Sequence, residues 1–229
     1  MVIIYNTVNS VNNINTVNCI LLYDLVHISI RVGIMNKDIQ KQRMKRLFID
    51  EAKKLLISEG VQSVSTRKVG ELTGYSYATI YNYFKNLDHL LWCLGIDFVQ
   101  DIVKIYEKDF IKDHYTPEDI KQLFARYIDY YFLNPNVFKF FFFYQLEEPL
   151  DEMKGEFVRP SLEKVLINIL ENLALQRIIK EEKVQIISSL IMNSVHGMLL
   201  MYFSKKRRVT EQEIHRKSDE IIEFLLGGQ

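Results

Sequence analysis

Tyrosine and short polar side chains alternate in residues 73–84, which read TGYSYATIYNYF. Four tyrosines share this segment with Ser76, Thr79 and Asn82, and each of these polar side chains needs a hydrogen-bond partner wherever it is buried. Hydroxyl and amide groups of this kind also donate hydrogen bonds to phosphate oxygens. The segment is therefore a candidate for binding a polyanion as well as for packing in a core.

Groups that perform catalysis do not come together in the sequence. The chain lacks GxSxG and HExxH motifs, a phosphate-binding glycine loop and a Gly-rich dinucleotide fingerprint. Glu211, His215 and Asp219 would share one stripe of a helix, and a solvated surface explains this stripe better than a metal site. We therefore expect no enzymatic activity, no metal and no cofactor.

Charge is unevenly distributed although the formal net charge is +0. Residues 36–85 carry ten Lys or Arg and five Asp or Glu, a net of +5, while residues 1–35 balance, so residues 86–229 carry −5. A basic segment can neutralise phosphates and so bind nucleic acid. The alternative is a helix-rich surface with random asymmetry of charge.

Composition and periodicity predict an all-α fold that positions these side chains. Hydrophobic residues make up 48% of the chain, with only 4 Pro and 9 Gly. Around the polar segment we expect three helices: one to residue 59 that Gly60 ends, one capped by Ser65 or Thr66 that Gly74 ends, and one capped by Ser76. Val69, Leu72, Ile80 and Phe84 are expected to face inward, and a tight turn of this kind predicts a helix-turn-helix.

Longer helices are expected after residue 86, where prolines mark several of the starts. Consecutive phenylalanines in FKFFFFYQL, residues 138–146, point all round a helix, which favours a buried central helix over a ligand-binding element. The predicted helices cover residues 87–113, 117–133, 135–145, 149–175, 181–204 and 210–226.

Residues 1–35 are predicted to be an extension of the helical protein. Six asparagines interrupt its first half, no basic residue precedes Arg31, and the apolar run from Cys19 to Ile34 has 16 residues. This order of residues is unlike a secretory signal, and the run is shorter than the roughly 20 residues of a membrane-spanning helix. We expect no membrane partner, and one hypothesis is that the functional protein begins at Met35.

Residues 65–86, STRKVGELTGYSYATIYNYFKN, resemble the DNA-binding domain of the TetR family of transcriptional regulators. The shared pattern is a Ser/Thr-Thr-Arg-Lys opening, a glycine turn, a Thr-aliphatic-Tyr run and a closing Lys-Asn after an aromatic residue. The helix at residues 40–59 fits the family as well. The resemblance implies a DNA-binding domain at residues 36–86 and a helical ligand-binding and dimerisation domain at residues 87–229.

The resemblance also assigns roles to individual residues. It places Ser65 and Thr66 on phosphates and Arg67 within reach of a guanine edge, where an arginine is the best bidentate donor. Base-reading and phosphate-binding positions follow on the third helix. The complete set of expected DNA-binding residues is Ser65, Thr66, Arg67, Ser76, Tyr77, Ala78, Thr79, Tyr81, Asn82, Tyr83 and Lys85.

Three positions in this segment or next to it depart from the family pattern. Leu87 replaces a lysine that binds a phosphate, and Gly70 replaces an alanine, which is expected to loosen the second helix. Tyr77 stands where the family has a smaller or polar residue, so the operator sequence should differ. By helical phase Tyr77, Tyr81 and Tyr83 face outward, and Tyr75 in the turn is expected to be the buried ring.

The resemblance implies a homodimer through the last two helices, 181–204 and 210–226. Apolar stripes run along both, including Val184, Ile187 and Ile191 on the first, although an intrachain core would produce the same pattern. A wall of an apolar ligand pocket is expected from Tyr127, Tyr131, Phe142, Met192 and His196.

The predicted function is a cytoplasmic, homodimeric repressor that binds a pseudo-palindromic double-stranded DNA operator and is released by a small-molecule ligand. Two widely separated cysteines, Cys19 and Cys93, fit a reducing compartment. The alternative is a helical interaction protein that has lost DNA binding.

Overall fold

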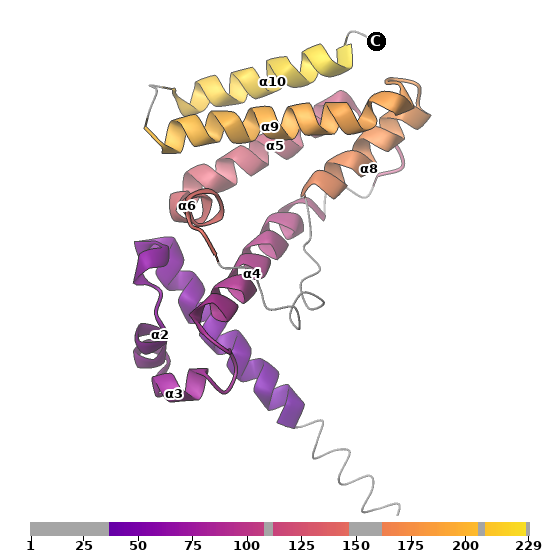
Figure 1. Cartoon of the computed structure of the whole chain (residues 1–229). Helices are drawn as coiled ribbons and strands as arrows, with labels where there is room; N and C mark the ends of the chain where they lie inside the picture. The colour runs from indigo at the N-terminus through magenta and orange to yellow at the C-terminus, as the bar shows by residue number, and fades with distance from the viewer. Residues whose placement is uncertain (1–36, 108–111, 147–161, 206–208, 228–229) are drawn as a thin grey trace, which may run out of the picture. The chain divides into compact units, whose positions relative to one another are not determined.

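The computed structural model describes residues 37–107, 112–146, 162–205 and 209–227 of the chain (Figure 1). By contacts the chain divides into two compact units, residues 1–48 and 49–229. In the first unit, residues 37–48 are helical, and the expected extension at residues 1–35 lies outside the described residues. The second unit holds the remaining elements.

Every regular element among the described residues is helical, which confirms the predicted all-α fold. The second unit opens with helical residues 49–59 and a short 3-10 turn, η1 (Val61–Ser63), and another such turn, η2 (Glu181–Lys183), precedes α9. The α-helices are α2 (Thr66–Thr73), α3 (Tyr77–Ile80), α4 (Leu87–Glu107), α5 (Pro117–Leu133), α6 (Pro135–Phe143), α8 (Leu162–Leu175), α9 (Val184–Phe203) and α10 (Glu211–Gly227).

The observed helix bounds agree closely with the predicted ones where a proline or a capping residue marks the start of a helix. Thr116 and Asp119 form a capping box that spans Pro117, and α5 has the predicted bounds. Two predictions were too long: the helix expected to reach residue 113 has ended by Lys112, and the helix expected to reach residue 145 ends at Phe143. Of the helix predicted at 149–175, the part before residue 162 lies outside the described residues.

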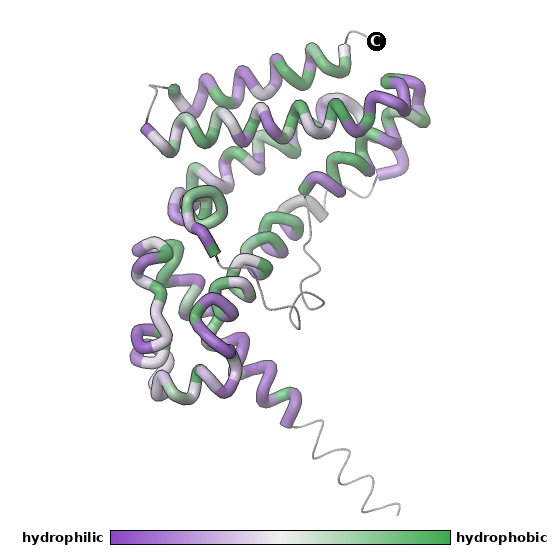
Figure 2. The backbone as a smooth tube through the Cα atoms, in the orientation of Figure 1, coloured by the Kyte–Doolittle hydropathy of each residue, from purple (hydrophilic) through white to green (hydrophobic). Residues whose placement is uncertain are grey.

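Helix α9 is central to the C-terminal half, where it contacts α5, α6, α8 and α10. Its buried face carries Val184, Ile187 and Ile191, so the stripe expected to face a second chain is largely intrachain core. The tube in Figure 2 shows mostly hydrophobic residues along α4, whereas hydrophobic and hydrophilic residues alternate along α10. The alternation in α10 is that of a helix with one covered and one solvated face.

The phenylalanine run forms part of an aromatic core rather than a wholly buried helix. Phe138 stacks on Phe142 and on Phe203 of α9, with ring centroids 4.4 and 4.5 Å apart. Phe140 is also buried, but Phe143 is 51% exposed. The expected central burial therefore holds for one side of α6, and a second side reaches solvent.

Among the described helices, the run Glu181–Phe203 is long and apolar enough to cross a membrane by length and composition. Only 28% of its most apolar 18-residue window is buried within the chain. The same length and composition occur in core helices of soluble proteins and in helices that associate with another chain.

Candidate nucleic-acid interface

Two serine caps fix the helices that carry the predicted binding residues. The Ser65 hydroxyl oxygen accepts a hydrogen bond from the Lys68 backbone N–H at 3.2 Å, and Ser76 Oγ accepts one from the Thr79 N–H at 3.2 Å. A serine hydroxyl that accepts such a bond also carries a hydrogen that it can donate. Both caps thus fix a helix start and place a hydroxyl group at it.

A close backbone contact holds α2 against the turn that follows it. A Cβ on Gly70 would lie 2.7 Å from the Tyr75 carbonyl oxygen and 3.3 Å from the Tyr77 nitrogen. Tyr75 N–H donates to the Gly70 carbonyl at 3.0 Å, and Gly74 takes a left-handed conformation with φ 75°. Gly70 therefore permits a tighter turn than alanine would, and the expected loosening of α2 stays a prediction.

Two side chains near this turn lie on the opposite side from the one predicted. Tyr75, expected to be buried, is 42% exposed, and Leu72, expected to face inward, is 53% exposed. Only Val69 and Gly70 of the eight-residue α2 are buried, so Leu72 lies off its covered side. Tyr75, which was placed by its position in the turn, follows the left-handed Gly74 and lies at the surface. Val69, Ile80 and Phe84 are buried as predicted.

Tyrosine rings are the largest side chains on the surface of this region. Tyr77 is 61% exposed and Tyr81 48% exposed, while Tyr83 is intermediate. The Tyr81 hydroxyl lies 3.4 Å from Thr66 Oγ1, so one hydroxyl from α2 and one from the turn after α3 face the same point. The structure thus brings together two residues that the sequence assigned separately to phosphates.

Arg67 extends from α2 with its side chain 84% exposed. Its Nε donates to Glu71 Oε1 at 3.0 Å, one helical turn along the exposed surface. Sequence reasoning did not single out Glu71, although an acidic residue four positions after an arginine is the signal for such a pair. An exposed pair of this kind contributes little to stability, so Arg67 can exchange its partner.

The remaining predicted residues frame this surface. Ala78 and Asn82 are exposed, and Thr79 is half-buried with its hydroxyl 2.9 Å from Ser76 Oγ. The backbone N–H of Lys85 donates to His89 Nδ1 at 3.1 Å, and Asn86 Oδ1 accepts from the His89 N–H at 2.8 Å. Asn86 therefore caps the start of α4, where Leu87 offers no cation.

Four of the five expected ligand-binding residues meet in a cluster that joins α5, α6 and α9, with Tyr127 and Tyr131 buried and Phe142 and His196 half-buried. Tyr127 Oη lies 2.7 Å from His196 Nε2 and 3.4 Å from Tyr131 Oη, and the rings of Phe142 and His196 are 5.0 Å apart. Burial lowers the pKa of His196 and raises that of Tyr131 well above its ordinary value. Met192 lies on the same helix as His196, with no described contact to the cluster.

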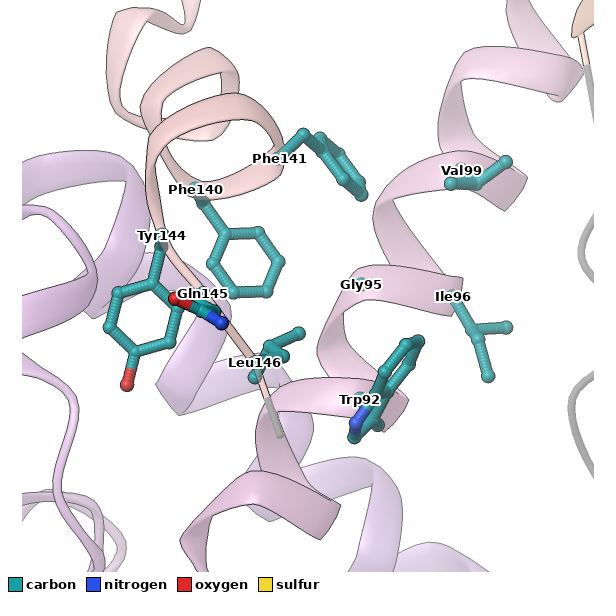
Figure 3. Close-up of a pocket in the computed structure, with 9 residues that line it drawn as sticks. All are labelled: Trp92, Gly95, Ile96, Val99, Phe140, Phe141, Tyr144, Gln145 and Leu146. Carbon is teal, nitrogen blue, oxygen red and sulfur yellow. The ribbon is translucent and has the colours of Figure 1, made fainter. Parts of the chain in front are cut away.

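A cavity of about 450 Å³ opens elsewhere, between α4 and α6. Figure 3 shows Phe140 and Phe141 extending from α6 toward the α4 residues Gly95 and Val99. Sequence reasoning missed this pocket because it assigned the phenylalanine run to core and sought the ligand around α5 and α9. We call it the α4–α6 pocket; its lining residues are Trp92, Gly95, Ile96, Val99, Phe140, Phe141, Tyr144, Gln145 and Leu146.

The sequence and the fold both match known regulators. Residues 48–91 match the family model for bacterial regulatory proteins, tetR family. No curated protein matches the chain. Because the match to the family model falls on the helix-turn-helix, it confirms the resemblance on which the assignment of this surface depends.

Solved structures of TetR-type regulators share the fold over nearly their whole length. A TetR-family regulator from Mesorhizobium loti superposes with a TM-score of 0.62 at 17% identity, covering 82% of this chain and 96% of the other. FadR from Bacillus subtilis, solved with stearoyl-CoA, has a TM-score of 0.62 at 18% identity, with 80% of this chain and 98% of the other covered. FadR from Thermus thermophilus, a repressor solved with lauroyl-CoA, has a TM-score of 0.57 at 14% identity, with 81% of this chain and 94% of the other covered.

Proposed function

We propose that this TetR-type regulator is a homodimeric repressor that binds a DNA operator through α2 and α3 and is released by an apolar ligand. The observation that carries DNA binding is the exposed surface formed by Thr66, Arg67, Tyr77 and Tyr81 on a backbone fixed by two caps and a tight turn. Guanidinium and hydroxyl donors on a rigid support are what phosphates and base edges require.

Within this surface the side chains divide by role. Arg67 gives up Glu71 to reach a guanine edge, Tyr77 and Ala78 meet bases, and the Thr66 and Tyr81 hydroxyls share a phosphate. Ser65, Ser76, Thr79, Asn82, Tyr83 and Lys85 complete the contacts. Glu71 would then lie near the DNA as a carboxylate, which disfavours binding wherever Arg67 has not found its base.

A selection of duplexes from random DNA, followed by fluorescence anisotropy, tests the DNA-binding role. Arg67→Ala should reduce the ratio of specific to random affinity, because a good bidentate pair discriminates by about 1–3 kcal/mol. Lys54→Ala removes an exposed cation outside the surface and serves as the control. Equal losses on selected and random DNA for Arg67→Ala would contradict base reading, and the absence of any selected duplex would favour the helical interaction protein.

The proposed dimer uses α9 and α10, which offer exposed apolar side chains. Ile186, Leu190 and Met201 recur on the outer face of α9 at 55%, 43% and 44% exposure, and Phe224 of α10 is 83% exposed. This is a different stripe from the buried one at Val184, Ile187 and Ile191. An apolar helix whose most hydrophobic window is 28% buried has surface left for a second copy.

Analytical ultracentrifugation of charged variants tests the dimer. Leu190→Glu should yield monomers, because the glutamate would be desolvated in the interface. Leu175→Glu is the control, since Leu175 is 83% exposed at the end of α8 and does not belong to the exposed stripe of α9 and α10. A dimer that survives Leu190→Glu but dissociates with Leu175→Glu would place the interface elsewhere.

The α4–α6 pocket is the proposed ligand site. It is lined mainly by aliphatic and aromatic side chains, with Gln145 and the Tyr144 hydroxyl as polar groups, which suits an acyl chain. FadR proteins of similar fold were solved with fatty acyl-CoA molecules, so stearoyl-CoA is a suitable first probe. The cluster at Tyr127, Tyr131, Phe142 and His196, with Met192, is the alternative site.

Trp92 makes ligand binding measurable because it is the one tryptophan of the sequence and lines this pocket. Stearoyl-CoA should change its fluorescence and lower the affinity for the selected DNA. Val99→Phe would reduce both effects by filling the pocket, whereas Met192→Phe should leave them unchanged and keeps Trp92 as the one tryptophan. If the substitution at Met192 reduced both effects and the substitution at Val99 did not, the ligand would be assigned to the cluster of Tyr127, Tyr131, Phe142 and His196.

The proposal includes no catalysis and a cytoplasmic location. Among the described residues no cluster of His, Cys, Asp or Glu could hold a metal ion. Release from DNA then requires no catalytic step. A ligand changes the spacing of the two recognition surfaces of the dimer by binding one conformation of the dimer better than the other.

A further inference from the structure

Helices α4 and α6, which form the walls of the α4–α6 pocket, both contact the helical residues 49–59. Asp97 of α4 pairs with Lys53, and Asn136 of α6 donates to the carbonyl of Ile57. We infer that Lys53 and Asn136 are positioning residues that transmit the occupancy of this pocket to the recognition surface. This inference rests on the proposed function, and it names the side chains through which regulation would act.

The contact from α4 is a shielded cluster around Lys53. Its ammonium group pairs with Asp97 at 2.5 Å and with Asp101, and it lies 5.1 Å from the centroid of the Phe98 ring. The side chains of Lys53 and Asp97 are 15% and 6% exposed. A pair with so little water around it depends steeply on distance, so a shift of α4 is felt by residues 49–59.

The contact from α6 is a side-chain cap on the same segment. Asn136 Nδ2 donates at 3.0 Å to the carbonyl of Ile57, one of the last carbonyl groups of the helix, which have no partner within it. Gly60 ends this helix with φ 87°, and a Cβ there would lie 3.7 Å from Asn136 Oδ1. Asn136 therefore fixes the end of the segment against the first turn of α6.

From this end, further contacts lead to α2. Glu59 pairs with Lys68 at 2.6 Å, and Ser63 Oγ donates to the carbonyls of Gly60 at 2.7 Å and Leu55 at 3.4 Å. The backbone N–H of Lys68 also donates to the Ser65 hydroxyl that caps α2. A displacement of residues 55–60 therefore reaches the start of α2, next to Thr66 and Arg67.

Gly95 of α4 faces the phenylalanine side chains of α6 across the pocket. A Cβ there would meet Phe140 at 3.5 Å and Phe141 at 3.9 Å, which is ordinary contact. A leucine at this position would extend beyond that contact into the pocket and push α4 and α6 apart, as a bound ligand would. Gly95→Leu is thus a surrogate for occupancy that requires no knowledge of the ligand.

The experiment combines this surrogate with loss of the α6 contact in the full chain. Gly95→Leu should weaken binding to the selected DNA by about ten-fold, within the usual range of coupling between sites. In an Asn136→Ala background the loss should shrink to about two-fold, because α6 no longer holds Ile57. Asn168→Ala, an exposed asparagine on α8, is the control background and should leave the ten-fold loss intact.

Hydrogen exchange of residues 55–64, measured without DNA, provides a readout that does not depend on operator binding. Exchange there should rise in Gly95→Leu relative to the wild type, and in an Asn136→Ala background Gly95→Leu should add little further rise. Val99→Phe replaces the first variant if Gly95→Leu does not fold. A conservative Lys53→Arg should keep the response, whereas Lys53→Met should lose it while thermal melting still shows a folded protein.

Either of two results would overturn the inference: equal loss of DNA affinity in the Asn136→Ala and Asn168→Ala backgrounds, or unchanged exchange at residues 55–64 in the pocket-filling variants. If the wild-type chain bound no DNA at all, the proposed function would fail, and the exchange measurement would still decide the inference.

Discussion

The two tyrosine-rich regions of this chain use the same side chain in opposite ways. In the helix-turn-helix, Tyr77 and Tyr81 are 61% and 48% exposed on elements of a few residues. In the C-terminal half, Tyr127 and Tyr131 are 4% and 3% exposed on a helix of 17 residues. Residue type therefore does not decide whether a ring is core or surface; the packing around the ring does.

Polar partners distinguish the two regions as well. The buried hydroxyl of Tyr127 lies 2.7 Å from His196 Nε2, so its hydrogen-bonding capacity is used inside the protein. The Tyr81 hydroxyl has one described contact, to Thr66 at 3.4 Å, which is long for a hydrogen bond between hydroxyls. The outer tyrosine is thus available for a stronger acceptor, such as a phosphate oxygen.

The largest expected effect comes from the turn that makes the outer region possible. Gly70→Ala should destabilise the protein by about 1–3 kcal/mol, because the new methyl group would lie 2.7 Å from the Tyr75 carbonyl oxygen. Urea unfolding measures this loss of stability, and fluorescence anisotropy measures its effect on binding to the selected DNA. Gly95→Ala is the control with ordinary contacts, and equal stability of both variants would mean that α2 tolerates a wider turn.

Removal of one hydroxyl from the inner region should come next in size. Tyr127→Phe deprives His196 of its 2.7 Å partner and should cost about 1 kcal/mol of unfolding free energy. Denaturant midpoints measure this loss, and DNA affinity should stay at the wild-type value. A fall in DNA affinity without a loss of stability would mean that the inner cluster belongs to the signalling route.

Acid should weaken the inner region before it affects the outer one. Burial holds the pKa of His196 below its ordinary value of 6.5, so the unfolded chain binds a proton more readily than the folded one. The contribution of neutral His196 is present above pH 6.5 and is lost as pH falls from there toward the folded pKa. Unfolding free energies from pH 7.5 to 5.5 should therefore fall more steeply for the wild type than for His196→Gln, and parallel curves would contradict this assignment.

The same deletion of one hydroxyl in the outer region should have the smallest effect on stability. Tyr81→Phe should leave the unfolding free energy within about 0.5 kcal/mol of the wild type, since the ring is at the surface. It should weaken selected and random duplexes alike, because a phosphate contact carries no sequence information. A loss confined to the selected sequence would make Tyr81 a base-reading residue.

The sequence predicted the elements of this fold well because their ends are marked by local chemistry. Ser65, Ser76, Gly74 and Pro117 act within one turn of their own position, so caps and starts followed from residue type alone. Tyr75 was misplaced because the burial of a turn residue depends on the path of the chain after Gly74, and Leu72 because only Val69 and Gly70 of the short α2 are covered.

Contacts between distant segments lay beyond what the pattern could give. The close approach of Gly70 to Tyr75 depends on the path of a turn, and the α4–α6 pocket depends on which side of the phenylalanine run meets Gly95. Likewise, Val184 and Ile187 form a stripe that would suit either a second chain or α8 and α10, and only the packed structure assigns it to the core.

DNA binding by the outer surface is the central claim, and its salt dependence tests it most directly. The full chain should retard the duplex upstream of its own gene, and the logarithm of affinity should fall linearly with the logarithm of salt concentration. The slope should be about −0.9 for each phosphate neutralised and shallower for Lys85→Ala if this lysine binds a phosphate. No retardation at low salt, or an affinity independent of salt, would contradict the account.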